Sequence, residues 1–288
     1  MKSILVTGAN GQLGKEIQSL ASDVKNFNFI FTDVSNLDIT DEASLSKFFG
    51  ENNIDYIVNC AAYTAVDKAE TDSELCNKIN SVAVKNLVSF AEEYNINFIT
   101  VSTDYVFDGT NYKPYTEDEK TSPNSVYGAS KLAGETEALK YERSIIIRTS
   151  WLYSHYGANF IRTMLSLTET RNELNVIFDQ IGTPTYAADL AEAIIEIIRY
   201  SENNEFVAGI YNYSNEGVTS WYDFAKTIFK LTNTNCKVFP IETKDYPTPA
   251  ARPHYSVLNK SKIKDTLNLY IPYWEDSLAE CLKEHRKK

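Results

Sequence analysis

Residues 3–14 read Ser3-Ile4-Leu5-Val6-Thr7-Gly8-Ala9-Asn10-Gly11-Gln12-Leu13-Gly14, an apolar run of strand length followed by glycines in a G-x-x-G-x-x-G spacing. A helical pattern continues from there to Ala21. Glycines between a strand and a helix allow a tight turn, close approach of the backbone to a pyrophosphate, and close packing of helix on strand. The position of this loop predicts a dinucleotide-binding unit.

Through the first half of the chain, apolar runs of strand length alternate with longer amphipathic stretches. This alternation predicts a parallel sheet with helices on both faces. After Arg148 the rhythm loosens. We therefore expect an α/β fold, a Rossmann-type doubly wound parallel sheet with a smaller C-terminal substrate-binding lobe. The expected strands are 3–6, 27–32, 56–60, 97–102, 144–148, 175–178 and 209–213, and the expected helices are 13–21, 42–49, 74–94, 126–139, 159–167, 187–200, 220–231 and 274–284.

These patterns also suggest a division of the chain. We place an NAD(P)-binding Rossmann domain at residues 1–150, with returning segments at about 175–213. The substrate-binding lobe is expected to comprise residues 151–174 and 214–288. Between residues 240 and 253 the chain carries four prolines, which is typical of irregular surface chain or of a lid.

Composition is that of an ordinary globular protein, with 43% hydrophobic and 23% charged residues. A net charge of -11 argues against a nucleic-acid or anionic-membrane partner. We expect no membrane span and no secretory signal, because long apolar windows and a basic N-terminal region are missing from the sequence. The four cysteines are far apart, which favours free thiols in a reducing cytoplasm.

A tyrosine and a lysine four residues apart occur twice, at Tyr127–Lys131 and at Tyr222–Lys226. On a helix this spacing puts both side chains on one face, where the cation favours the phenolate and lowers the phenol pKa from about 10. Such a tyrosine can exchange a proton with a carbonyl oxygen while hydride moves at the carbon. The second copy lies on an apolar helical face that packing explains.

The predicted strand ends place Tyr127 and Lys131 at the same edge of the sheet as the glycine loop. Ligands of such sheets bind beyond the carboxyl ends of the strands. Asp33 ends the second strand, where an acid can bond the adenosine ribose, and Thr103 ends the fourth. Tyr127 and Lys131 begin the next helix and are expected to face the nicotinamide. An acid at position 33 usually favours NAD over NADP, but the neighbouring residues leave the choice between NADH and NADPH open.

The glycine spacing resembles that of the extended short-chain dehydrogenases. Nearly the whole chain, moreover, resembles the dTDP-4-dehydrorhamnose reductase family. The resemblance implies reduction of the 4-keto group of dTDP-4-dehydro-L-rhamnose to dTDP-L-rhamnose, using NADPH or NADH, in the last step of dTDP-rhamnose synthesis. Dehydratases of the group carry Asp-Glu after the threonine, whereas Thr103 is followed by Asp104-Tyr105, which disfavours elimination of water. The matching runs are 62–70, 102–109, 148–153, 159–160, 179–185 and 251–253.

The resemblance also implies roles for individual residues. Tyr127 is the proton donor, Lys131 bonds the nicotinamide ribose and lowers the pKa of Tyr127, and Thr103 holds the carbonyl oxygen. Trp151 offers an apolar wall to the deoxysugar, and Arg252 grips the diphosphate with its planar fork. Cofactor binding is expected at Gly8, Asn10, Gly11, Gln12, Leu13, Gly14, Asp33, Asp38, Ile39, Cys60, Ala61, Ala62, Tyr127 and Lys131. Substrate binding is expected at Thr64, Val66, Asp104, Tyr105, Trp151, Asn159 and Arg252.

Alternatives concern the metal, the assembly and the function. Some relatives bind Mg²⁺ at a dimer contact through glutamates. Glu16 matches one of these positions, but Ala188 stands where a second glutamate is found, so we predict no metal, and a monomer or a homodimer. Two other functions stay open. One is another sugar-nucleotide epimerase or keto-reductase, and the other is a non-catalytic regulatory subunit resembling that of methionine adenosyltransferase.

Overall fold

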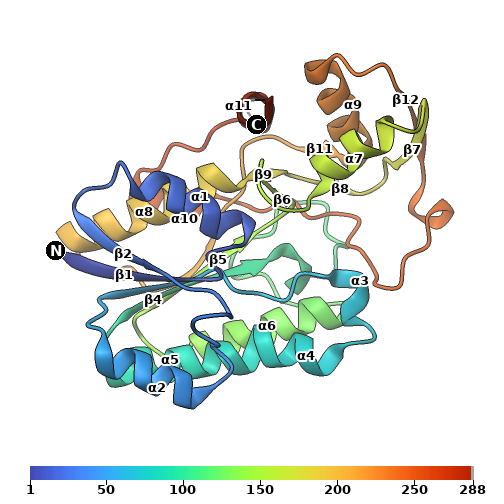
Figure 1. Ribbon diagram of the computed structural model, residues 1–288. Helices are drawn as coiled ribbons and strands as arrows, with labels where there is room; N and C mark the ends of the chain where they lie inside the picture. The colour runs from blue at the N-terminus through green and yellow to red at the C-terminus, as the bar shows by residue number, and fades with distance from the viewer. Residues whose placement is uncertain (287–288) are drawn as a thin grey trace.

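The computed structural model describes residues 1–286, which are built around a six-stranded sheet (Figure 1). Its strand order is β10-β5-β4-β3-β1-β2, and each neighbouring pair is parallel. The chain adds β2 on one side of β1 and β3 on the other. A topological switch point, where such sheets bind ligands, therefore lies at the carboxyl ends of β1 and β3. The strands are β1 Lys2–Thr7, β2 Phe27–Phe31, β3 Tyr56–Asn59, β4 Asn97–Thr103, β5 Ser144–Thr149 and β10 Gly209–Asn212.

Helices cover both faces of this sheet, as the sequence predicted. Figure 1 shows α1, α8 and α10 above the sheet and α2, α5 and α6 below it. Ile17 and Ile194 pack with β1 and β3 on the first side, while Leu45 and Leu87 pack on the second. Helix ends follow local chemistry: α6 begins after Ser125, whose Oγ accepts from the Gly128 amide at 3.1 Å. The helices are α1 Gln12–Ala21, α2 Glu42–Glu51, α5 Ala83–Glu93, α6 Val126–Ala138, α8 Ala187–Asn203 and α10 Ser261–Leu267.

The helical stretch predicted over residues 74–94 is present without a gap, but the sequence did not indicate that its second turn has π geometry. It consists of α4 Ser73–Asn77, a π-helical turn Lys78–Val82, and α5. Asn80 lies in the turn, where its Oδ1 accepts a hydrogen bond from the backbone amide of Tyr63 and its Nδ2 donates to the Tyr63 carbonyl oxygen. The same Nδ2 donates to Ser130 Oγ at 3.0 Å. A π turn inserts one residue into the helical repeat, and hydrophobic periodicity does not register this change.

A smaller lobe follows β5 and has its own apolar core, in which Tyr153, Phe224 and Trp274 are buried together. Residues 175–213 divide between the two parts: β7 pairs with β12 in the lobe, whereas β10 pairs with β5 at the edge of the large sheet. The remaining elements are α3 Val66–Ala69, β6 Leu152–Tyr153, α7 Phe160–Thr168, β7 Glu173–Ile177, β8 Ile181–Gly182, β9 Thr185–Tyr186, β11 Thr219–Ser220, α9 Trp221–Thr232, β12 Lys237–Ile241, α11 Trp274–Arg286, and 3₁₀ turns at Asp104–Val106 and Thr243–Asp245.

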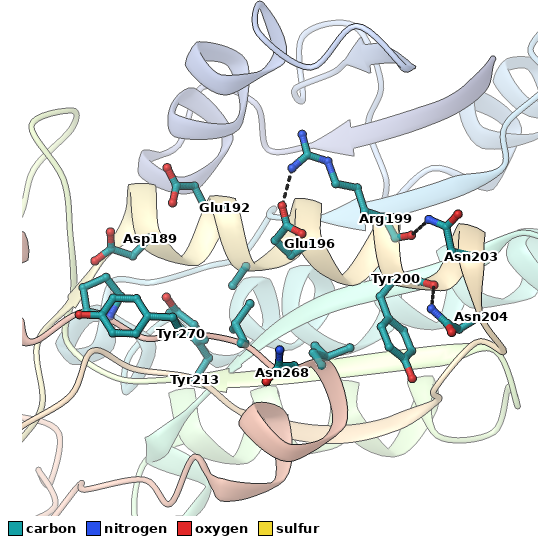
Figure 2. Close-up of a pocket in the computed structure, with 14 residues that line it drawn as sticks. Asp189, Glu192, Glu196, Arg199, Tyr200, Asn203, Asn204, Tyr213, Asn268 and Tyr270 are labelled. Carbon is teal, nitrogen blue, oxygen red and sulfur yellow. Dashed lines mark hydrogen bonds and ion pairs between the residues drawn. The ribbon is translucent and has the colours of Figure 1, made fainter.

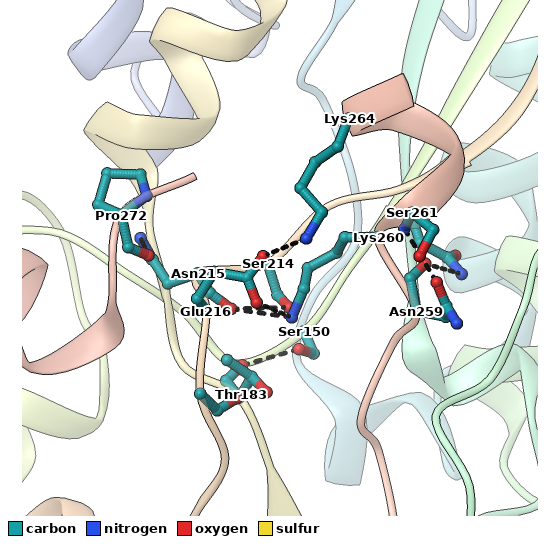
Figure 3. A network of polar contacts seen from close by, with 12 residues as sticks. Ser150, Thr183, Ser214, Asn215, Glu216, Asn259, Lys260, Ser261, Lys264 and Pro272 are labelled. Carbon is teal, nitrogen blue, oxygen red and sulfur yellow. Dashed lines mark hydrogen bonds and ion pairs between the residues drawn. The ribbon is translucent and has the colours of Figure 1, made fainter. Parts of the chain in front are cut away.

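A polar network joins the lobe to the sheet layers (Figure 3). Glu216, after β10, accepts from Lys264 at 2.8 Å and pairs with the buried Lys260 at 3.4 Å. Beside it, Asn215 donates to Asp189 of α8 and to Ser277 of α11. The network thus ties α8, α10 and α11 to one loop. Among the described helices, none has both the length and the apolarity needed to span a bilayer.

Candidate active site

At two of the three loop positions, close contacts between backbone atoms leave no room for a side chain. Gly8 has φ +63°, and a Cβ there would lie 2.6 Å from the backbone of Ala61. A Cβ on Gly14 would lie 2.5 Å from the Gly8 carbonyl oxygen, so α1 packs directly on the loop. At Gly11 a Cβ would meet only that same oxygen, at 3.2 Å, and Gly11 lines a cavity. The second glycine therefore keeps the backbone open toward a ligand.

This cavity, of about 370 Å³, lies at the switch point. Most of the predicted cofactor residues that follow strand ends line it. The sequence did not indicate one wall, which is formed by residues from the first turns of the helical stretch 73–93, including Lys78. The four-residue spacing of Leu75 and Ile79 was the signal that could have revealed this wall, because it puts both side chains on one helical face. The lining residues are Gly8, Gly11, Asp33, Val34, Leu37, Asp38, Ile39, Thr40, Cys60, Ala61, Ala62, Leu75, Lys78 and Ile79.

Two acids shape the same cavity. Asp33 accepts from the backbone amides of Asn10, at 2.9 Å, and Val34, at 2.8 Å, so its carboxylate supports the glycine loop. Asp38 accepts from the hydroxyl and the amide of Thr40, and these bonds hold the pKa of Asp38 below its ordinary value. Helix α1 begins at Gln12 without a side-chain cap or an acid in its first turn. Its free N–H groups suit an anion, so the loop and cavity fit a dinucleotide.

The remaining loop residues are placed around this site rather than along its wall. Leu13 is buried in the core beneath the loop. The side chain of Gln12 accepts from Asn159 Nδ2 at 2.9 Å, which attaches the lobe to the glycine loop. Asn159 also caps α7 by accepting from the Arg162 amide. The structure therefore places Asn159, predicted to bind substrate, against the predicted cofactor loop.

Thr103, Tyr127 and Lys131 lie between β4 and α6. Thr103 ends β4, and Lys131 Nζ reaches the β4 carbonyl oxygen of Val101 at 2.7 Å. The ring of Tyr127 meets the ring of Tyr105 edge to face, with centroids 5.5 Å apart. The elements thus bring the predicted triad to the carboxyl end of the sheet, next to the 3₁₀ turn that carries Asp104 and Tyr105.

The pKa of Tyr127 moves in the opposite direction to the sequence-based expectation. Burial raises the pKa of Tyr127 above its ordinary value, and the hydrogen bond with Thr103 opposes that rise. Burial lowers the pKa of Lys131 to about 8, although Glu135 raises it. The lowering of the Tyr127 pKa predicted from Lys131 was therefore wrong for this structure, because loss of water on burial is the largest influence on this phenol.

Asp104 is buried and faces the triad. Its Oδ1 accepts from Thr103 Oγ1 at 2.9 Å, and Tyr105 N donates to the same hydroxyl at 3.2 Å. Burial raises the pKa of Asp104 to about 6, while hydrogen bonds from Ser256 and Thr103 oppose the rise. The Thr103 hydroxyl is thus oriented from two sides by its own chain neighbours.

The predicted aromatic wall is a pair of indoles. Trp151, in the left-handed region at φ +49°, stacks on Trp221 with centroids 3.6 Å apart and planes 10° from parallel. Trp221 begins α9 and directly precedes Tyr222, on the helix whose apolar face was predicted to serve packing. A Cβ on Gly182 would come within 2.6 Å of the Trp151 ring, so this glycine allows the indole to lie where it does.

Arg252 forms a bidentate ion pair with Asp67 at the start of α3, with N–O distances of 2.8 and 2.7 Å. The sequence did not indicate this partner. Val66 begins the same helix, and the exposed Thr64 precedes it. The predicted substrate residues around α3 are therefore close to the Arg252 segment.

Two other features lie apart from these residues. A cavity of about 550 Å³ lies between α8 and the loop 267–272, lined by Asp189, Glu192, Glu196 and Tyr270 among others (Figure 2), and none of the predicted site residues lines it. Glu16, considered above for Mg²⁺, is buried and accepts from Ser154 Oγ at 2.5 Å.

Comparison with known proteins gives consistent matches. The family model described as RmlD substrate binding domain matches residues 1–287. A dTDP-4-dehydrorhamnose reductase of Escherichia coli strain K12 is 39% identical, over 98% of this chain and 97% of that protein. The crystal structure of a dTDP-4-dehydrorhamnose reductase from Clostridium acetobutylicum has a TM-score of 0.93 at 42% identity, covering 99% of each chain. A Bacillus anthracis dTDP-4-dehydrorhamnose reductase in complex with NADP has a TM-score of 0.93 at 37% identity, covering 99% of this chain and 100% of that one.

Proposed function

We propose a function for this chain, which belongs to the RmlD substrate binding domain family. It reduces the 4-keto group of dTDP-4-dehydro-L-rhamnose to dTDP-L-rhamnose, as an NAD(P)H-dependent oxidoreductase in dTDP-rhamnose synthesis. The observation that carries the proposal is the likeness to dTDP-4-dehydrorhamnose reductases along essentially the whole chain, in both sequence and fold. Thr103, Tyr127 and Lys131 at the carboxyl end of β4 and the start of α6 are the chemical groups that such a reduction needs.

The cofactor, NADPH or NADH, binds along the glycine loop and the cavity beside it. Gly11 and the start of α1 would hold its pyrophosphate, and Asp33, Asp38 and Ile39 would hold its adenosine end. Cys60, Ala61 and Ala62 border the middle of the molecule. When bound there, the nicotinamide supplies the hydride that reaches the carbonyl carbon.

Tyr127 donates the proton that the carbonyl oxygen takes up. Its raised pKa keeps the phenol protonated before the reaction, which suits a proton donor. The Tyr105 amide donates to the Thr103 hydroxyl oxygen, and Asp104 accepts the hydroxyl proton. Thr103 holds the carbonyl oxygen by turning this proton from Asp104 to the substrate. Lys131 bonds the nicotinamide ribose and stabilises the phenolate that remains on Tyr127 after transfer.

The sugar nucleotide occupies the space between the 3₁₀ turn after β4, α3 and the lobe. Trp151, stacked on Trp221, provides the apolar face for the deoxysugar. Arg252 binds the diphosphate, and Thr64, Val66, Asp104 and Tyr105 line the sugar end. Asn159 contributes through the start of α7, which it caps.

Each part of the chain has its own task in this proposal. Residues 1–150, with α8 and β10, form the cofactor-binding domain. Residues 151–174 and 214–288 supply most of the lobe that selects the substrate. The enzyme acts in the cytoplasm on a small-molecule substrate, as a monomer or homodimer, without nucleic acid or membrane as a partner.

The test of this function is an assay in which the protein receives dTDP-4-dehydrorhamnose with NADPH or NADH. The loss of absorbance of the reduced nicotinamide is followed over time. Stoichiometric oxidation of the cofactor with formation of dTDP-rhamnose is the expected result. Folded protein that oxidises neither cofactor overturns the proposal. Purified protein that retains tightly bound NAD and interconverts sugar nucleotides without net oxidation points to an epimerase instead.

A further inference from the structure

The ion pair between Arg252 and Asp67 connects segments 185 residues apart in the chain. Arg252 follows β12, and Figure 1 shows this orange-red stretch running beside α3, where Asp67 lies in the first turn. Arg252 Nη1 donates to Asp67 Oδ1 at 2.8 Å, and Nη2 donates to Oδ2 at 2.7 Å. Nη1 also donates to the carbonyl oxygen of Ala250 at 3.0 Å. A bidentate pair of this kind fixes the plane of the guanidinium.

This geometry leaves one edge of the guanidinium without a hydrogen bond to the described residues. Of the five N–H groups of an arginine, the bonds to the described chain use both on Nη1 and one on Nη2. The two that remain, on Nε and Nη2, point from the same edge and form a second fork. Phosphate oxygens can accept hydrogen bonds from this edge while the Asp67 carboxylate stays bound to Nη1 and Nη2. Asp67 therefore holds Arg252 without occupying its anion-binding edge.

Helix α3 is itself attached to the helix of the proton donor. Glu70, which follows α3, accepts from the backbone amide of Val126 at 2.9 Å, one residue before Tyr127. Asp67 also accepts from the Ala250 amide at 3.2 Å, so it holds the backbone of the Arg252 segment as well as the side chain. Hydrogen bonds from Arg252 hold the pKa of Asp67 below its ordinary value, which keeps the carboxylate charged at neutral pH.

We propose that Asp67 is a positioning residue: it holds the end of Arg252 and aims the free guanidinium edge at the diphosphate, at a distance from Tyr127 that α3 fixes. The inference rests on the proposed function, since it takes a nucleoside diphosphate as the ligand of Arg252. An arginine with its side chain ordered in advance binds more tightly, because less conformational freedom is lost on binding.

The experiment compares Asp67→Asn, Arg252→Met and the double variant, with Asp55→Asn as a matched control. The Asp55 carboxylate likewise accepts one hydrogen bond from a backbone amide, that of Ser3, and one from a side-chain cation, that of Lys2. Asp55 belongs to none of the sites described above. Calorimetry measures the affinity for dTDP and for thymidine, which lacks phosphates, and kinetics separates KM from kcat. The calorimetry needs no turnover, so it tests Asp67 even if reductase activity is not found.

We expect Asp67→Asn to weaken dTDP binding and to raise KM for the sugar nucleotide about tenfold, with kcat changed less than about twofold. Thymidine and NADPH affinities stay at wild-type values. In the Arg252→Met background the Asp67 change has no further effect, because its partner is gone. Two outcomes overturn the inference and leave the reductase function standing. In one, the losses of dTDP affinity add in the double variant. In the other, Asp67→Asn weakens dTDP binding no more than Asp55→Asn does.

Discussion

Tyr127 and Tyr222 carry the same short pattern with a lysine four residues later, but Tyr127 lies beside the carboxyl end of the large sheet and Tyr222 lies in the lobe. Tyr222 has Lys226 over its ring at 5.9 Å and lies on α9 of the lobe. Tyr127 lies against Tyr105 at the carboxyl end of β4. The spacing alone therefore does not distinguish a proton donor from a surface pair, and the position in the sheet does.

Replacing the proton donor is the first prediction at this scale. Tyr127→Phe removes the phenol and should lower kcat about 100-fold or more, because the phenol is the proposed source of the proton that the carbonyl oxygen takes up. NADPH affinity, measured by fluorescence titration, should stay near wild type. Tyr222→Phe is the matched control, since it alters the second copy of the pattern, and it should keep full activity. Unchanged turnover in Tyr127→Phe would mean that another group donates the proton.

Lys131 leads to a prediction about pH. Its pKa of about 8 lies below the ordinary value of 10.5, so the charged form is lost as pH rises through about 8. Because the charge on Lys131 binds the ribose and stabilises the phenolate, kcat/KM for the sugar nucleotide should fall above pH 8. Tyr127 does not produce this limb, since its pKa is raised. The free energy of unfolding should rise over the same range. Between pH 8 and 10.5 the folded state binds fewer protons at Lys131 than the unfolded state, so the destabilisation caused by burying this charge becomes smaller as pH increases.

The control for the pH prediction is Lys131→Arg, which stays charged throughout this range. Whatever its absolute activity, its pH profile should lack the fall near pH 8. A profile that keeps the fall would assign it to a different group.

At the scale of elements, α6 is locked to β5 by a buried ion pair. Arg148 donates to both oxygens of Glu135, at 2.9 and 2.7 Å, and the two side chains are 3% and 2% exposed. The guanidinium also lies over the ring of Phe107, 5.1 Å from its centroid. Because Glu135 is one turn from Lys131, the pair also fixes the part of α6 that carries Lys131.

Breaking this pair should cost stability. Glu135→Gln leaves the buried charge of Arg148 without a partner, and we expect the free energy of unfolding in urea to fall by about 3–5 kcal/mol. The double variant Glu135→Leu with Arg148→Met should recover most of that loss, since both charges are removed. Glu137→Gln, which breaks an exposed pair with Lys140 on the same helix, should change stability by less than about 1 kcal/mol. Equal effects of Glu135→Gln and Glu137→Gln would contradict the argument.

For the whole molecule, the question is what holds the lobe on the sheet domain. The network around Asn215 and Glu216 is one such joint, because it reaches α8, α10 and α11 from a single loop. Figure 3 shows the part of it around Glu216, Lys260 and Lys264. Burial lowers the pKa of Lys260, and Glu216 opposes that change. Glu216 therefore favours the charged form of Lys260.

Glu216→Gln tests this joint. The substitution removes the partner of a nearly buried ammonium, so the free energy of unfolding should fall by about 1–3 kcal/mol, with kcat unchanged. Chemical denaturation measures the loss, and Glu242→Gln, which breaks an exposed pair with Lys244, serves as the control. A Glu216 variant as stable as the Glu242 variant would show that other contacts hold the lobe.

Local patterns in the sequence were enough for the parallel sheet, the glycine loop and the placement of Thr103, Tyr127 and Lys131. The alternation of apolar runs, the glycine spacing and a lysine one turn after a tyrosine each depend on residues close in the chain. The π turn at Lys78–Val82 escaped the same reasoning, since one inserted residue barely changes the hydrophobic period.

Tertiary structure alone determined the rest. It brought Asp67 to Arg252 across 185 residues, Gln12 to Asn159, and Trp221 to Trp151. It also determined the directions of the pKa shifts of Tyr127, Lys131 and Asp104, because burial depends on how the whole chain packs and not on neighbouring residues. The sequence by itself therefore determined which groups could carry out the chemistry, and packing determined their charge, orientation and partners.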